Sequence, residues 1–373
     1  MRLCYISTGN FAHVGAYLEH FSRAGHEVHF AALSPSPPRG VITHELGLGG
    51  RYSGTEGKWK YPLSMLRARA LIARLKPDVV HTHYATSGGL AGLVCGYRPT
   101  VVTAHGTDLT EGSRSPLWRG LLRAVFAQAD CVNAVSEDLK RMAVGLGVDA
   151  GKIEVLTLGV DTSRFVPGAS SRPAGAALRL ICTRRLAPEC DPATIVEALA
   201  LARRAGAAFE LTFAGDGELR GELEALVRRR GLGGAVAFLG AVPNDALPAL
   251  LRDGDAYVSA SVRDGTSLSL LEALSAGLFP IVSSIPANRA WLEDAGGASF
   301  FQPGDADGLA RALLAFARRP SAAKRAAAGN RVKVVRLGDR ATNMGRLESL
   351  YRGLIERRKK YCDGAIRTAG RPL

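Results

Sequence analysis

Residues 259–277 combine the signals of an anion-binding helix start with a carboxylate in an apolar run. The preceding apolar residues, 256–258, predict a buried strand, and Asp264 to Ser267 carry the signals of a helix start. Free backbone N–H groups and the positive end of a helix dipole at such a turn favour a phosphate. Glu272 follows within the predicted helix, and a carboxylate accepts hydrogen bonds from sugar hydroxyls. The spacing suggests a nucleotide sugar, with its diphosphate at the helix start and its ribose at Glu272.

Two arginines follow the predicted strand 178–183. Arg184 and Arg185 are suited to bidentate binding of a diphosphate, and their adjacency favours this role for at least one of them over a purely surface role. The glycine turn at 213–217 follows another strand. Gly215 there would let a base or phosphate approach the backbone, although a tight turn alone also explains it.

Histidines end two further strands. His105 follows the apolar run 99–104 and is placed to hydrogen-bond a sugar hydroxyl, unless it is only a turn histidine. Asp108 would cap the next segment or face a cleft. His81 and His83 end the preceding strand, so a three-histidine zinc site is conceivable. No Cys or acidic ligand accompanies them, and the sequence predicts no metal.

Short apolar runs alternate with amphipathic stretches along the whole chain. Strands are expected at 2–7, 27–32, 78–83, 99–104, 130–134, 153–157, 178–183, 208–214, 235–239, 255–259, 279–282 and 298–301. Helices are expected at 13–24, 62–75, 87–95, 115–128, 136–146, 191–205, 217–230, 266–276 and 305–318. This alternation is typical of βαβ units in doubly wound parallel sheets, where ligands bind at the carboxyl ends of strands.

The stretch 163–175 is rich in Pro, Gly and Ser and predicts a linker. We therefore expect an α/β protein of two Rossmann-like domains facing a cleft. Their expected ranges are 1–162, on the acceptor side, and 176–335, which binds the nucleotide sugar. A basic helical segment, 336–373, is expected to follow and can pack back on the N-terminal domain.

The composition is that of a globular protein, with 373 residues, 47% of them hydrophobic. No segment reaches the roughly 20 apolar residues of a membrane helix. The first residues, 1–7, are too quickly polar for a signal peptide. The six cysteines are scattered with no C-x-x-C pair, which favours reduced thiols and a cytoplasmic location.

The positive charge is concentrated in residues 316–373, which hold 16 Lys and Arg against 4 Asp and Glu. This tail, with four consecutive basic residues at 357–360, can lie on an anionic surface at the inner face of a membrane or form a solvated helix face. It has few aromatic residues, so nucleic acid is not expected.

Several other chemistries are disfavoured. The first strand is not followed by G-x-G-x-x-G, and the chain has no G-K-[ST] or G-x-S-x-G. These absences argue against a nicotinamide cofactor, a P-loop kinase and a hydrolase. The acidic pairs Asp253/Asp255 and Asp305/Asp307 could hold Mg²⁺ but are better explained as structural residues.

Over residues 1 to about 318 the chain resembles the family 4 glycosyltransferases, retaining nucleotide-sugar enzymes with the GT-B fold. The order and spacing of short motifs carry the resemblance. They are Gly25-His-Glu-Val28, Lys76-Pro-Asp-Val-Val-His81, His105-Gly-Thr-Asp108, Gly159-Val-Asp161 with Phe165, Arg184-Arg-Leu186, Gly215-Asp-Gly217 and the block Asp264 to Gly277.

The resemblance implies roles for individual residues. Arg185 matches the diphosphate-binding arginine, Glu272 the glutamate that holds the ribose, and His105 the histidine that faces the transferred sugar. Asp108 is placed with His105 as catalytic. The remaining implied donor-binding residues are Arg184, Gly215, Asp264, Gly265, Thr266, Ser267, Leu268 and Arg289. Among these, Asp264 contacts the donor sugar, and the amides of the three residues 266–268 meet the sugar and its phosphate.

Three departures from the family pattern suggest a divergent branch. Cys190 stands where a phosphate-binding lysine is usual. A donor-proximal loop with Gly9, His13 and Gly15 replaces paired glycines near the N-terminus. Asp264 is one methylene shorter than the usual glutamate.

The resemblance implies transfer of a sugar, with retention of configuration, from a UDP- or GDP-sugar to a saccharide or lipid-linked acceptor. Such transfer belongs to the synthesis of envelope polysaccharide or glycolipid. The leaving diphosphate would help deprotonate the acceptor, with no protein nucleophile, no cofactor and no obligatory metal. Two alternatives stay open, namely a nucleotide-sugar epimerase of the same fold and a non-catalytic partner that binds sugar nucleotides.

Overall fold

The computed structural model of the chain describes residues 1–8, 11–33, 41–47, 61–110, 112–168, 176–293 and 297–369. They form two compact units, the first made of Met1–Leu158 with Thr342–Leu373 and the second of Gly159–Ala341. The expected linker, 163–175, begins inside the second unit by this division, because the Phe165 ring is buried in that unit's core. Residues 169–175 of the expected linker lie outside the described residues.

The first unit is built on a seven-stranded parallel sheet in the order β3-β2-β1-β4-β5-β6-β7. Its strands are β1 (Arg2–Ser7), β2 (Glu27–Ala32), β3 (Ile42–Glu45), β4 (Val79–His83), β5 (Thr100–Ala104), β6 (Cys131–Ala134) and β7 (Ile153–Val155). Its helices before the second unit are α1 (Phe11–Arg23), α2 (Tyr61–Leu75), α3 (Gly89–Cys95), α4 (Thr107–Thr110), α5 (Pro116–Gln128) and α6 (Glu137–Gly145).

The second unit has a six-stranded parallel sheet in the order β10-β9-β8-β11-β12-β13. Its strands are β8 (Leu178–Cys182), β9 (Phe209–Phe213), β10 (Val236–Phe238), β11 (Ala256–Ser259), β12 (Phe279–Ser283) and β13 (Ser299–Phe301). Its helices are α7 (Pro192–Arg204), α8 (Arg220–Arg229), α9 (Leu247–Arg252), α10 (Leu268–Ser275), α11 (Pro286–Leu292), α12 (Ala306–Arg318), α13 (Pro320–Ala326) and α14 (Ala328–Leu337).

Two apolar layers hold the second unit together. One layer joins α7, α8 and α12, and the other joins α9, α10, α11 and α14. Because its strands are parallel and covered on both faces, strands such as β11 and β12 are buried along their whole length. Apolar residues in the sequence could therefore locate the strands of this sheet.

The fold class is as expected, and all twelve predicted strands are confirmed within a few residues. The edge strand β3 was missed, since it is short and its residues are half-buried or exposed rather than an apolar run. The helices α9 and α11 were also missed, and each is shorter than two turns. The helix expected from 266 begins at Leu268, because Ser267 is its N-cap.

Both sheets reverse their strand order at one place, between β1 and β4 in the first unit and between β8 and β11 in the second. In open α/β sheets, ligands bind in the crevice outside the carboxyl ends of the strands at such a switch point. The residues that directly follow these strands are therefore the first candidates for function.

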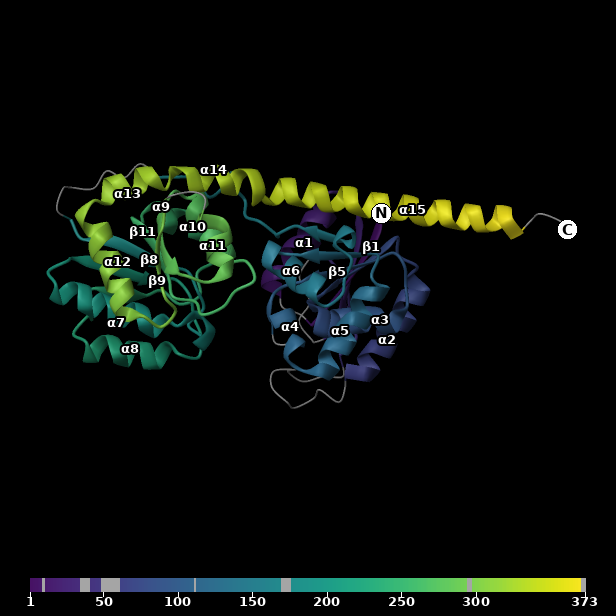
Figure 1. The fold of residues 1–373 in the computed structure, drawn as a ribbon, viewed down its shortest axis with the longest axis horizontal. Coiled ribbons are helices and arrows are strands. Elements are labelled where there is room, and N and C mark those ends of the chain that lie inside the picture. The colour runs from purple at the N-terminus through teal and green to yellow at the C-terminus, as the bar shows by residue number, and fades with distance from the viewer. Residues whose placement is uncertain are drawn as a thin grey trace. The chain divides into compact units, whose positions relative to one another are not determined.

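Helix α15 (Arg340–Ala369), yellow in Figure 1, carries the chain back to the first unit. Tyr351 is fully buried there, and its hydroxyl lies 3.1 Å from that of Tyr5. The neighbouring Leu347 and Leu354 are also buried. Among the helices that the structure describes, neither α15 nor any other is long and apolar enough to cross a lipid bilayer.

Candidate functional site

A buried ion pair joins the two strand ends at the switch point of the second unit. Arg184 follows β8 and Asp264 follows β11, and their side chains meet with a 2.9 Å Nη2–Oδ2 distance. Both side chains are less than one-fifth exposed. Burial lowers the pKa of the Arg184 guanidinium, but the charge of Asp264 and other partners raise it above its ordinary value. The Arg184 guanidinium therefore stays charged.

The start of α10 is tied to the same arginine. The Ser267 hydroxyl accepts a hydrogen bond from Leu270 N (3.2 Å), as an N-cap does, and another from Arg184 Nη1 (3.1 Å). One residue earlier, the Thr266 hydroxyl donates to the Gly265 carbonyl at 2.9 Å. Gly265 N in turn donates to Asp264 Oδ1 at 2.8 Å. These bonds bring the predicted residues 264–268 and Arg184 together around one helix N-terminus.

The glycine turn after β9 packs directly on the loop that carries Arg184. A Cβ atom at Gly215 would collide with the Arg184 carbonyl, and one at Gly217 would collide with the Leu186 carbonyl. Leu186 N also donates to the carbonyl of Asp216 at 3.1 Å. Gly215 therefore fixes the arginine loop, which is a clearer role than the open approach considered from the sequence.

The second predicted arginine, Arg185, has a different environment. Its side chain is 68% exposed and lies 3.3 Å from Glu218 and 3.9 Å from Glu189. Such exposed ion pairs are weak, so an anion can replace these partners at little cost. Arg184 is already held by protein groups, whereas the Arg185 guanidinium is available to bind an anion.

Glu272 lies in the second turn of α10 and is only 7% exposed. Burial raises the pKa of its carboxyl to about 7, against the opposing effect of the positive charges of Arg340 and Arg164. A carboxyl group with such a pKa in an otherwise apolar helix is a candidate for function rather than packing.

Two further residues of the second unit, Arg289 and Cys190, were singled out in the sequence. Arg289, on α11, donates to Ser284 at 2.8 Å and to Glu293 at 2.9 Å, so its fork is engaged within its own helix and loop. Cys190, which replaces the usual lysine of the family, is buried and interacts with Arg184. A thiol side chain therefore takes the place of the lysine ammonium group.

In the first unit, the predicted histidine His105 follows β5 and belongs to a stack of rings. Its ring lies 4.4 Å from that of Tyr84 and 5.2 Å from that of His83, both at interplanar angles below 30°. His83 Nδ1 and His105 Nε2 are hydrogen-bonded at 2.9 Å. Stacking and this bond fix the orientation of the His105 ring.

Asp108, predicted to be catalytic, is turned into the protein instead. It is 4% exposed, and its carboxylate accepts hydrogen bonds from four backbone amides, those of Ala85, His105, Gly106 and Leu109. Burial raises its pKa although these amides act in the opposite direction. With both oxygens so engaged, Asp108 positions the His105 turn rather than contacting a substrate.

The three-histidine zinc site does not form. His81 uses one ring nitrogen on the Tyr351 hydroxyl (2.5 Å) and the other on the Thr103 hydroxyl (2.6 Å). Burial lowers its pKa to about 3, so the ring is neutral. Within the described residues, no cluster of three His, Cys, Asp or Glu side chains is arranged to hold a metal.

The donor-proximal loop is only partly described. Gly9 lies outside the described residues, as does the side chain of His13. The backbone of His13 and Gly15 is helical, within α1, rather than in a loop. Helix α1 thus contains two of the three residues that were expected in the loop.

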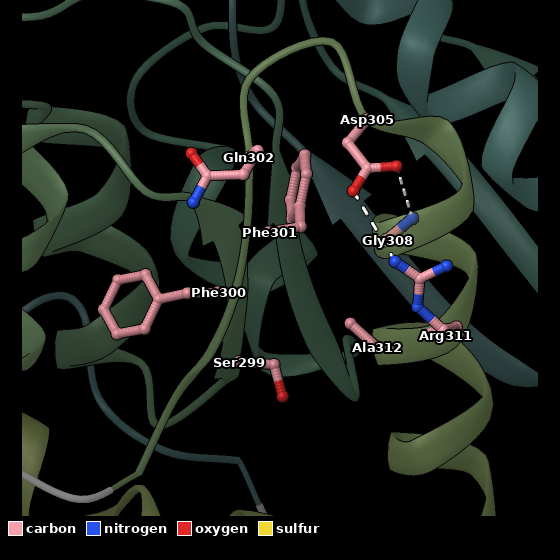
Figure 2. A pocket seen from close by; sticks show the side chains of 8 residues that line it. All are labelled: Ser299, Phe300, Phe301, Gln302, Asp305, Gly308, Arg311 and Ala312. Atoms are coloured by element: carbon pink, nitrogen blue, oxygen red, sulfur yellow. Dashed lines mark hydrogen bonds and ion pairs between the residues drawn. The ribbon is translucent and has the colours of Figure 1, made fainter.

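A pocket of about 450 Å³ lies between β13 and α12 (Figure 2). Its two charged residues are Asp305 and Arg311, which form a 3.6 Å ion pair. Asp305 also caps α12 by accepting from Gly308 N at 2.7 Å. In the other acidic pair, Asp253/Asp255, the Asp255 carboxylate forms an ion pair with Lys324 at 2.6 Å. In each acidic pair, one aspartate is thus engaged by protein groups.

Sequence reasoning missed the interactions that join distant residues. The Arg184–Asp264 pair spans 80 positions, and only the adjacency of β8 and β11 brings it together. The burial of Tyr351 against His81 likewise depends on the return of the chain to the first unit. The four amides around Asp108 had one local signal, the Gly106 turn, which made a capping role an alternative from the start.

Two family models match the chain. The family described as Glycosyltransferase Family 4 matches residues 9–164, and that described as Glycosyl transferases group 1 matches residues 170–333.

Curated relatives carry related names. The amylovoran biosynthesis glycosyltransferase AmsK of Erwinia amylovora is 25% identical over 71% of this chain and 67% of its own length. The putative colanic acid biosynthesis glycosyltransferase WcaL of Salmonella typhimurium is 26% identical over 65% of this chain and 62% of its own length. The phosphatidyl-myo-inositol mannosyltransferase of Mycolicibacterium smegmatis is 28% identical over 81% of this chain and 79% of its own. This chain thus matches somewhat under two thirds to about four fifths of these relatives.

Solved structures share the fold. Sucrose-phosphate synthase from Thermosynechococcus elongatus superposes with a TM-score of 0.80 at 19% identity, covering 95% of this chain and 99% of that one. HepE of Anabaena in complex with UDP has a TM-score of 0.73 at 16% identity, covering 95% and 100%. The two parallel-sheet units thus have the GT-B architecture, and with both family models matched along most of its length, the chain belongs to the family 4 glycosyltransferases.

Proposed function

We propose that this protein transfers a hexose from a nucleotide diphosphate sugar to a saccharide or lipid-linked acceptor, with retention of configuration. The observation that carries the proposal is the buried Glu272 on a helix whose N-terminus gathers Arg184, Asp264 and Ser267. An anion site and a hydrogen-bond acceptor for hydroxyls on one helix match the two halves of a nucleoside diphosphate.

The spacing along α10 supports this match. Glu272 lies about 6 Å beyond Leu268 along the helix axis, at 1.5 Å per residue. A diphosphate at the amides of residues 266–268 would leave the ribose next to Glu272. The two ribose hydroxyls would donate to the carboxylate, and the bonds are stronger to its ionised form.

Two cations have separate tasks in this proposal. Arg184 keeps the turn of Asp264 and Ser267 in place, while the exposed Arg185 leaves its weak partners to bind the diphosphate. The neutral Cys190 adds no charge, so the helix dipole and Arg185 neutralise the leaving group. We further propose that no metal is required for this step.

On the acceptor side, His105 would present its ring to the transferred sugar. The stack with Tyr84 and His83 fixes the ring, and the Asp108 carboxylate fixes the backbone of its turn. In a retaining transfer the leaving diphosphate takes the proton of the acceptor on the same face. No side chain is then needed as a nucleophile.

The names of the relatives support the class of acceptor and donor. They include proteins named for the biosynthesis of amylovoran and colanic acid and for phosphatidyl-myo-inositol mannosylation, and HepE is solved with UDP and with UDP-glucose. We propose an acceptor of envelope polysaccharide or glycolipid synthesis and a UDP- or GDP-sugar donor. The enzyme would act in the cytoplasm, with the basic residues 357–360 of α15 at an anionic membrane surface.

Calorimetric titration with a panel of UDP- and GDP-sugars tests the donor site. Glu272→Ala should weaken the binding donor by about 10-fold to 100-fold, the range for a hydrogen bond to a charged group. Glu210→Ala removes an exposed carboxylate of the same unit and is the matched control. Unchanged affinity in Glu272→Ala would refute the donor-site assignment.

Incubation with the binding donor alone separates the alternatives. A transferase should release free nucleotide only slowly until an acceptor is added. Conversion of the donor sugar to its epimer without acceptor would instead identify an epimerase. Tight donor binding with neither transfer nor hydrolysis would identify a non-catalytic partner.

A further inference from the structure

A pocket of about 460 Å³ lies in the first unit, where α15 passes the loops that precede β4 and β5. These loops are at the amino ends of the parallel strands, whereas His83 and His105 are at the carboxyl ends. The pocket is therefore separate from the candidate site. The residues of its wall that matter here are Lys76, Pro77, Asp78, Tyr97, Arg358 and Lys359.

Three cations converge on this pocket without acidic partners. In the part of the chain that the structure describes, no carboxylate forms an ion pair with Lys76, Arg358 or Lys359. One and a half turns earlier on α15, by contrast, Arg352 is bound to Glu348 at 2.6 Å. The unpaired cations give the pocket a positive potential that favours an anion.

The one acid of the wall does not cancel this charge. Asp78 Oδ2 accepts a hydrogen bond from the backbone N–H of Arg2 at 2.7 Å. The guanidinium of Arg2 is paired with Glu27, which is the main cause of its raised pKa, and the charge of Asp78 adds a smaller effect in the same direction. The wall has three cations, Lys76, Arg358 and Lys359, against one acid, so its net charge is positive.

Contacts within the protein hold the side chains of the pocket wall in place. The Tyr97 hydroxyl donates to the Pro77 carbonyl at 2.5 Å, which fixes the ring. The Arg358 guanidinium lies over that ring, 5.2 Å from its centre, and Nη1 donates to the Tyr97 hydroxyl at 3.4 Å. Stacking orients the arginine without a carboxylate, so most of its donors stay available to a ligand.

Lys76 occupies an unfavourable backbone position. Its φ is 48°, a left-handed conformation in which glycine carries no steric penalty, and it directly precedes Pro77. It ends α2, with its N–H donating to the Ile72 carbonyl at 2.9 Å. This turn places Lys76 in the wall of the pocket.

We propose that this pocket binds a phosphate group, carried either by a lipid headgroup or by a soluble phosphorylated compound. Arg358 would bind the phosphate oxygens with its fork, and Lys76 and Lys359 would add point charges. The volume is that of a small-molecule site, and Ile355 and the Tyr97 ring provide an apolar surface for the carbon part of the ligand. The inference rests on the membrane contact proposed above only if the phosphate belongs to a lipid.

The first test titrates the whole chain with inorganic pyrophosphate in a calorimeter, and every variant is made in an Arg185→Ala background that weakens the diphosphate site of the second unit. Lys76→Gln/Arg358→Gln removes two pocket cations, and Arg357→Gln/Lys360→Gln removes two exposed cations that do not line it. The pocket variant should bind pyrophosphate roughly tenfold or more weakly, because it has lost two positive charges. The control variant should keep this binding. Equal binding in pocket and control variants would overturn the proposal.

The second test identifies the source of the phosphate. Vesicles containing phosphatidic acid are compared with vesicles brought to the same surface potential with oleate. A preference for phosphatidic acid that only the pocket variant loses would assign the site to a lipid headgroup. Pyrophosphate binding without that preference would assign it to a soluble compound. Equal weakening of vesicle binding in both variants, with no pyrophosphate binding, would show diffuse charge attraction and refute the pocket.

Discussion

The candidate residues lie at the carboxyl-end edge of each sheet, and the two edges differ in how they hold their polar side chains. In the second unit, the edge relies on charge, with Arg184 and Asp264 paired at 2.9 Å and Glu272 buried nearby. In the first unit, it relies on aromatic rings, with His83 and His105 stacked and hydrogen-bonded. In the second unit, Arg184 keeps its protein partners, whereas the neighbouring Arg185 can exchange its own for a diphosphate. In the first unit, the stacked rings can present a fixed shape to a sugar.

The same contrast appears in the response to pH. Burial raises the pKa of Glu272 from 4.5 to about 7 and lowers that of His81 from 6.5 to about 3. In both cases burial disfavours the charged form. Glu272 therefore costs stability as the pH rises, and His81 costs stability as the pH falls. The contributions of Glu272 and His81 to the free energy of unfolding should therefore change in opposite directions with pH.

The largest effect is expected from breaking the charged edge. Arg184→Ala should lower the free energy of unfolding by about 3–5 kcal/mol, because it leaves Asp264 buried without its partner. Chemical denaturation measures the loss. Arg184→Ala/Asp264→Ala should recover part of it, and Arg185→Ala, which removes an exposed arginine, should change stability by less than about 0.5 kcal/mol. Similar losses for Arg184→Ala and Arg185→Ala would contradict the assigned difference between them.

The next effect concerns Glu272. Its folded pKa is above the unfolded value, so its contribution is fully present below pH 4.5 and is lost as the pH rises through 7. Glu272→Gln should remove this loss and stabilise the protein at pH 8 by up to about 3 kcal/mol, while donor binding falls. Unfolding measured from pH 4 to 8 should show a smaller decline in the variant. Parallel curves for the two proteins would mean that Glu272 is not buried in its charged form.

His81 sharpens the comparison from the other side. Its folded pKa is depressed, so its contribution is present above pH 6.5 and is lost as the pH falls toward 3. The wild type should lose about 2 kcal/mol from this residue between pH 6.5 and 5. His81→Gln should be less stable at pH 7 but lack this part of the acid decline. An identical acid decline in the variant would place the responsible groups elsewhere.

The smallest effect is expected from the hydroxyl of Tyr351. Tyr351→Phe removes the partner of His81 and Tyr5 but keeps the buried ring. The loss should be about 1–2 kcal/mol, the cost of leaving a buried polar atom unsatisfied. Amide hydrogen exchange should show the loss in the strands β1 and β4. Faster exchange confined to β8 and β11 would be inconsistent with this contact.

Local patterns explain how much of the fold was predictable. Buried parallel strands form apolar runs, and residues such as Arg184 and His105 follow those runs directly, so both edges could be located from the sequence. The half-exposed strand β3 has no such run. Its pairing with β2 depends on tertiary context rather than on its own residues.

The interactions within the site were less accessible. Nothing local distinguishes the buried Arg184 from the exposed Arg185, since they are adjacent and identical. Their difference arises from the neighbour strand that brings Asp264 to one of them. Asp108 was likewise ambiguous, because a short acidic side chain after a glycine serves equally well as a cap or as a ligand.

The return of the chain at Thr342 bears on how the protein is made. The ribosome produces β1 and β4 early, but Tyr351 emerges only after the whole second unit has been translated. Until then, Tyr5 and His81 lack the hydroxyl that binds them both, and the surface that Leu347 will cover stays open. Such nascent surfaces are where chaperones act and where aggregation begins. The unit that is synthesised first is thus the last to be completed.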